Sequence, residues 1–120
     1  MRTLFALILL ISSMNAFAAD PVKEMVEKLL KAVEKSDATF IRNGDEHKAK
    51  EAAEHMRKKY EHFKKKIKTP EDFIELCATK SEISSKPYKI KTADGKTVES
   101  KDWMVARLEE IRKADPSNEK

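Results

Sequence analysis

The sequence predicts a small single α+β domain of about four helices and two short β-hairpins. Apolar residues recur at helical spacing in four segments, which indicates helices packed on a common core. The two glycines, Gly44 and Gly95, follow Asn43 and Asp94, and such pairs favour hairpin turns. A chain of 120 residues has room for one modest core.

Residues 1–18 are expected to be a cleavable export signal. A basic start at Arg2 precedes the apolar run Leu4–Ile11, and Ala16–Ala18 supplies the small residues that a signal peptidase reads. The run is shorter than the roughly 20 apolar residues of a membrane span, although a retained N-terminal anchor is the alternative. The mature protein is therefore expected to be periplasmic.

The first part of the mature chain predicts a helix followed by a hairpin. Asp20 and Pro21 are typical of a helix start, and this helix is expected to end near Ser36. Strands over Thr39–Arg42 and Asp45–Lys48 are expected to pair across the first turn. The buried face of the helix is predicted to hold Val22, Met25, Val26, Leu29, Leu30 and Val33.

Two further helices are expected next, one over residues 49–66 and one that begins at Pro70. Thr69 is expected to cap the latter, which has an acidic first turn and is expected to bury Phe73, Ile74 and Cys77. The apolar stripe of the former consists of Ala49, Ala52, Ala53, Met56, Tyr60, Phe63 and Ile67.

A serine-rich loop over Ser81–Lys86 leads into the second hairpin. Its first strand is expected to start at Pro87, and a three-residue loop with a left-handed Gly95 places Ile90 opposite Val98. One face of this strand is expected to carry Tyr88, Ile90 and Thr92.

A last helix is expected to begin after a capping Ser100. The mature domain is expected to cover residues 19–113, with a flexible polar tail over residues 114–120. The last helix is expected to bury Trp103, Met104, Leu108 and Ile111.

Four segments between residues 38 and 90 carry motifs of one family. They are Phe40–Gly44, Glu51–Lys59 (similar to E-A-x-x-H-L-R-x-K), Thr69–Ile74 and Ser81–Tyr88 (similar to S-x-x-[ST]-G-x-P-Y). In these segments the chain resembles the YfeK-like family, small exported bacterial proteins of unknown function. Ser85 stands where the family usually has glycine, and a positive φ there would strain the serine. The resemblance implies a periplasmic location and names no reaction.

The charge pattern limits the partners. The formal net charge is +4, and seven Lys or Arg residues fall within Arg57–Lys68. Tyr60 and Phe63 lie on the apolar stripe of that helix, so a solvated face is expected, with at most weak, salt-sensitive contact with a membrane surface. Nucleic acid is not an expected partner of an exported protein. Two isolated glycines build no phosphate-binding loop, and no cofactor is expected.

Cysteine and histidine chemistry is not favoured by the spacing. Cys77 lies on an apolar helix face, where a thiol behaves as a small hydrophobic group. Glu51, His55 and His62 share one side of a helix, but the two histidines are two turns apart, too far to bind one metal ion without another element. No metal site and no catalytic cysteine are therefore expected.

A polar set shared with the family is the candidate site. It consists of Arg42, Asn43, His55, Arg57, Ser81, Ser84 and Tyr88. Guanidinium, imidazole and hydroxyl groups suit a small anionic ligand or the carboxylate of a periplasmic protein partner, although turn formation, loop capping and packing also explain these residues. The leading interpretation is a non-enzymatic binding module. The alternative is a small hydrolase-like enzyme with His55 as general base.

The export signal makes a direct prediction. The intact mass of the protein recovered from the periplasm should correspond to a chain that begins at Ala19 or Asp20, because small residues precede this point. A membrane-bound form that retains residues 4–11 would contradict the cleavage.

Overall fold

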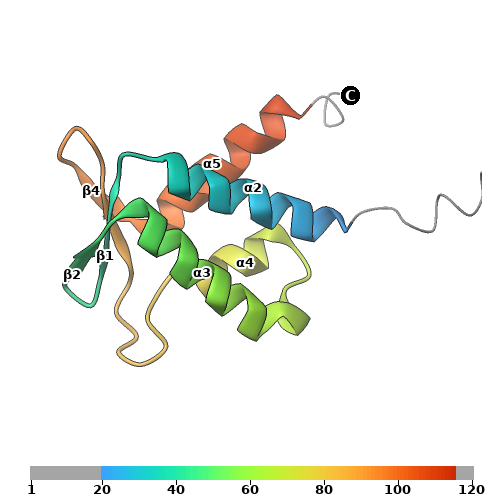
Figure 1. The fold of residues 1–120 in the computed structure, drawn as a ribbon, viewed down its shortest axis with the longest axis horizontal. Coiled ribbons are helices and arrows are strands. Elements are labelled where there is room, and N and C mark those ends of the chain that lie inside the picture. The colour runs from blue at the N-terminus through green and yellow to red at the C-terminus, as the bar shows by residue number, and fades with distance from the viewer. Residues whose placement is uncertain (1–19, 116–120) are drawn as a thin grey trace, which may run out of the picture.

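The computed structural model describes residues 20–115 and confirms the α+β class (Figure 1). The elements are α2 (Pro21–Lys35), β1 (Thr39–Arg42), β2 (Asp45–His47), α3 (Ala49–Phe63), the short 3-10 helix η1 (Lys64–Lys66), α4 (Pro70–Cys77), β3 (Lys89–Lys91), β4 (Thr97–Glu99) and α5 (Ser100–Ala114). The expected export signal lies outside the described residues, as does most of the expected tail. Within residues 20–115, no helix has the length and apolar character that a membrane crossing needs.

Both predicted hairpins form, and they combine into one antiparallel sheet with the strand order β2-β1-β3-β4. The second hairpin has the predicted register, with Ile90 opposite Val98 and Gly95 at a φ of +90°. The pairing of β1 with β3, which puts Phe40 opposite Ile90, was not apparent from the sequence. The four α-helices lie to one side of this sheet (Figure 1).

The core is built around α2, which packs against α3, α4 and α5. Each large aliphatic side chain that folding buries completely contributes about 1.5–3 kcal/mol of hydrophobic stabilisation. The predicted apolar face of α2 supplies four such residues, namely Val26, Leu29, Leu30 and Val33.

The predicted N-terminal caps of α2 and α4 are present. Asp20 accepts a hydrogen bond from the backbone of Val22 (3.0 Å). Thr69 and Asp72 cap α4 reciprocally, since each side chain accepts a hydrogen bond from the other residue's backbone N–H. These contacts satisfy donors that a helix leaves unpaired in its first turn.

Several expected element boundaries were wrong. Strand β2 ends at His47 and not at Lys48, and β3 begins at Lys89 and not at Pro87. The helix α3 ends at Phe63, because Lys64–Lys66 tighten into η1 before the chain turns toward α4. Ser100 is the first residue of α5 and does not cap it, since the cap position belongs to Glu99. The backbone N–H of Ser100 instead donates to the carbonyl of Tyr88 (2.9 Å), which holds Ser100 against the sheet.

Fewer residues of α5 are fully buried than expected. Met104 and Leu108 are buried, whereas Trp103 and Ile111 are only partly buried at the margin of the core. The Trp103 ring packs edge-to-face on Phe40, with ring centroids 5.7 Å apart, so the helix still seals one end of the sheet.

The serine-rich loop is strained at the residue that departs from the family. Ser85 has a φ of +60°, a left-handed conformation that costs an L-residue roughly 1–2 kcal/mol. Its backbone N–H donates to the carbonyl of Ser81 (3.0 Å), and the Ser81 hydroxyl accepts from the N–H groups of Ile83 and Ser84. These hydrogen bonds hold the loop in its turn.

Replacement of Ser85 by glycine should therefore stabilise the protein. We expect Ser85→Gly to raise the free energy of unfolding in urea by about 0.5–1 kcal/mol, since relief of strain exceeds the added freedom of the unfolded chain. Gly95→Ala is the matched control at a φ of +90° and should lower stability by about 1 kcal/mol. Equal stability of Ser85→Gly and the parent would contradict the strain.

Candidate functional site

A cleft of about 230 Å³ lies between α3 and the sheet. Its polar lining comes from Arg42, His47, Glu51, Glu54, His55, Lys58, Tyr88 and Ser100. Its apolar lining comes from Phe40, Ile41, Ala52 and Met56. Three of the seven predicted residues, Arg42, His55 and Tyr88, are thus brought together.

Strand register builds one wall of the cleft. Lys89 pairs with β1 on one side and with β4 on the other, which fixes the alignment of the three strands. The next position of this register places Tyr88 between Arg42 and Ser100. Because side chains alternate along strands, these three lie on the face that points toward the helices. The opposite wall is α3, which carries His55.

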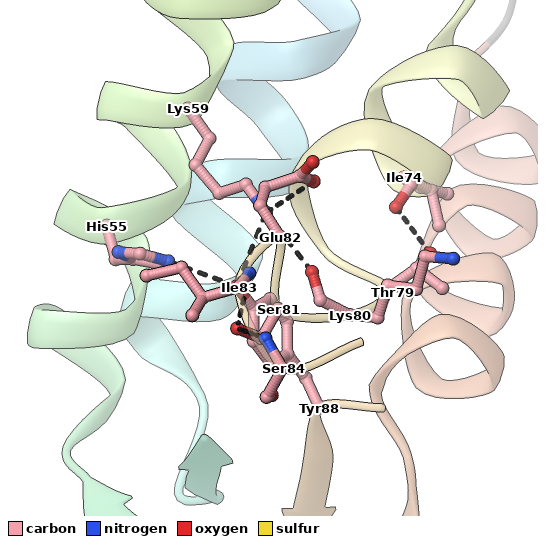
Figure 2. Close-up of polar contacts among 10 residues, drawn as sticks. All are labelled: His55, Lys59, Ile74, Thr79, Lys80, Ser81, Glu82, Ile83, Ser84 and Tyr88. Atoms are coloured by element: carbon pink, nitrogen blue, oxygen red, sulfur yellow. Dashed lines mark hydrogen bonds and ion pairs between the residues drawn. The ribbon is translucent and has the colours of Figure 1, made fainter. Parts of the chain in front are cut away.

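A chain of polar contacts joins α3 to the serine-rich loop (Figure 2). Lys59 Nζ donates to Tyr88 Oη (3.3 Å) and to the carbonyl of Lys80 (3.2 Å), and it lies 3.5 Å from Glu82 Oε2. Tyr88 Oη in turn lies 3.3 Å from His55 Nε2. An ammonium group can only donate, so the tyrosine oxygen accepts from Lys59 and its own proton is available to the imidazole.

The position of Lys59 was missed by sequence reasoning. It is mostly buried although it belongs to a run of basic residues that was expected to be solvated, and its ammonium lies 5.1 Å from the centre of the Tyr88 ring. Its spacing from His55, one helical turn, was the available signal, because residues four apart share a helix face.

His55 is held in its neutral form. Burial of the ring lowers its pKa to about 4, and the positive charges of Arg42 and Lys59 act in the same direction, with smaller effects from His47 and Lys58. Among the described residues, no carboxylate hydrogen-bonds to this ring, so a hydrolase-type triad is not formed. An imidazole of such low basicity is a weak general base near neutral pH.

Two cations in the cleft form no ion pair within residues 20–115. Neither Arg42 nor Lys58 makes a side-chain hydrogen bond or ion pair with a described residue, although both line the cleft. By contrast, Arg57, only one residue from Lys58, is paired with Glu27 at 2.7 Å. The cleft therefore offers two cationic donors that form no ion pair, together with the carboxylates of Glu51 and Glu54 in the same lining.

The other four predicted residues lie outside the cleft lining. Arg57 points to α2, where it forms the ion pair with Glu27. Ser84 Oγ donates to Asn43 Oδ1 (2.6 Å), and Ser81 caps its own loop. The Ser84–Asn43 hydrogen bond joins the serine-rich loop to the β1–β2 turn, and Ser81 holds the backbone of the loop itself.

Cys77 is confirmed as a core residue. It is fully buried and unpaired, and burial raises the pKa of its thiol to about 12. The thiolate needed for nucleophilic attack is therefore not formed at neutral pH. In the part of the chain that the structure describes, no three His, Cys, Asp or Glu side chains are grouped to hold a metal ion.

Comparison with known families now assigns the chain. A model of the family DUF5329, described as a family of unknown function, matches residues 20–112. The chain belongs to this family. The Uncharacterized protein YfeK of Salmonella typhimurium is 38% identical over 77 residues, which cover 64% of this chain and 62% of that relative. The chain thus spans less than two thirds of that relative's length.

These findings confirm the YfeK-like resemblance that the motifs indicated. No solved structure matches the chain.

The low pKa of His55 predicts a specific loss of stability in acid. Between pH 6.5 and 4 the unfolded chain binds a proton at His55 and the folded chain does not, so stability falls as the pH falls through this range. The ring is only partly buried, so we expect the free energy of unfolding to fall by about 1–2 kcal/mol after allowance for solvent screening.

Urea unfolding at pH 7.0 and 4.5 tests this assignment. The parent should lose more stability than His55→Gln by that amount, because glutamine does not titrate. His62→Gln, a change at an exposed histidine of the same helix, should behave like the parent. Parallel losses in the parent and His55→Gln would contradict the low pKa.

Proposed function

We propose that this protein is an exported periplasmic binding module, without catalytic activity, whose cleft binds an anionic group. The observation that carries the proposal is the pair of cations, Arg42 and Lys58, that line the cleft and form no ion pair with a described residue. The amino-terminal sequence, typical of an export signal, supports the periplasmic location.

An anion in the cleft would gain from its setting. Arg42 is partly buried, and a guanidinium binds a carboxylate or phosphate through two parallel hydrogen bonds. Hydrogen bonds to charged groups contribute roughly 1.5–3 kcal/mol, more than neutral pairs. A bound anion would also offset the mutual repulsion of Arg42, Lys58 and Lys59 around His55.

The alternative is an enzyme with His55 as general base, and the His55–Tyr88 contact is the observation that favours it. Two features weigh against it: the low basicity of the imidazole, and the absence of a hydrogen-bonded carboxylate at this ring among residues 20–115. Binding of an anion requires neither a basic imidazole nor a carboxylate bonded to it. The binding role is therefore the better account of this cleft.

Anion titration of the mature protein tests the proposal. We expect acetate and inorganic phosphate to shift the nuclear magnetic resonance signals of Arg42 and His55 saturably. Arg42→Gln should weaken this binding at least about tenfold, the equivalent of about 1.4 kcal/mol.

Arg57→Gln is the matched control, since it removes the same charge from a residue outside the cleft. It should leave anion binding unchanged. Absence of any saturable shift in the parent would overturn the binding role. Hydrolysis of a model ester that is lost in His55→Gln would favour the enzyme instead.

A further inference from the structure

We infer that the ligand of this cleft is a monocarboxylate with a short apolar body, and that Ser100 hydrogen-bonds its carboxylate. This inference deepens the proposed function and rests on it. It is carried by three features of the cleft: an unpaired buried hydroxyl, the balance of charges, and an apolar lining.

The hydroxyl of Ser100 is not explained by the fold. Ser100 lines the cleft and is fully buried, and its Oγ has no hydrogen-bond partner among the described residues. A buried polar group without a partner is unfavourable, and an alanine would pack equally well at this position. Because Glu99 holds the cap position, Ser100 is not needed to cap α5 either.

The position of Ser100 suits an anion. It is the first residue of α5, and a helix begins with backbone N–H groups that carry a partial positive charge, although the N–H of Ser100 itself already donates to the Tyr88 carbonyl. Glu99 makes no capping side-chain hydrogen bond to these groups. On the sheet, Ser100 and Arg42 lie on the two sides of Tyr88, so a carboxylate bound over this row lies between a hydroxyl and a guanidinium.

The charge balance favours a single negative charge over two. Glu51 and Glu54 line the same cleft as Arg42 and Lys58, so the formal charges cancel when the histidines are neutral. Glu51 is engaged at the start of α3, where it accepts from the Lys48 N–H (3.4 Å). A dianion such as phosphate would meet more repulsion from these carboxylates than a monoanion would.

The apolar lining indicates what the carboxylate is attached to. Phe40, Ala52 and Met56 are buried core residues that also border the cleft. A volume of about 230 Å³ is below the roughly 300–1,000 Å³ of sites for drug-sized molecules. A short hydrocarbon group fits this space, and it is supplied either by a free acid or by the last residue of a peptide.

Calorimetry of the mature protein with defined probes tests the inference. We expect hexanoate to bind at least about tenfold more tightly than inorganic phosphate, and hexanamide not to bind measurably. The dipeptide N-acetyl-Ala-Leu and its carboxamide distinguish the source. Tighter binding of the dipeptide acid than of hexanoate, lost in the carboxamide, assigns a peptide terminus, and the reverse order assigns a free acid.

Ser100→Ala separates a binding role from a structural one. It should weaken hexanoate binding at least about tenfold while the protein becomes no less stable in urea, because no folded-state partner of the hydroxyl is lost. Ser84→Ala is the control, a serine whose hydroxyl is bonded to Asn43 outside the cleft lining, and it should leave hexanoate affinity unchanged.

Two results would overturn the inference and leave the proposed function standing. One is equal hexanoate affinity in Ser100→Ala and the parent, and the other is phosphate binding that matches hexanoate, each with binding still dependent on Arg42. Failure of every anion to bind would instead remove the proposed function itself.

Discussion

Antiparallel pairing of β1 with β3 joins two hairpins that the chain separates by α3 and α4. The pairing places Phe40 beside Ile90, so both hairpins present one apolar face to the helices. The same register sets Arg42, Tyr88 and Ser100 side by side at the end of the sheet. Without this contact the molecule would have neither a continuous core nor a cleft.

Three unfavourable features among the described residues lie at the cleft. The hydroxyl of Ser100 is buried without a partner, Arg42 forms no ion pair with a described residue, and His55 is neutral among cations. Such departures from local optimum are expected at functional sites, because the rest of the fold compensates for them. Ser85, in the serine-rich loop that leads into Tyr88, has a strained backbone.

Family motifs mark two kinds of residue in this chain. Asn43 and Ser84 join the serine-rich loop to the first hairpin, Ser81 holds the backbone of that loop, and Arg57 ties α3 to α2. Arg42, His55 and Tyr88 line the cleft. The bracing holds the loop that leads into Tyr88, so a structural set of residues positions the set that is available for binding.

Much of the fold was determined by the sequence itself. Helical spacing, the caps at Asp20 and Thr69, and the left-handed Gly95 depend on neighbours within a few residues, so local patterns determined these elements and the second register. The pairing of β1 with β3 was decided only in the tertiary structure, because strand partners distant in the chain leave no local signal. The roles of Lys59 and Ser100 were decided there too, since burial of a lysine or loss of a hydroxyl's partners depends on which distant elements pack around it.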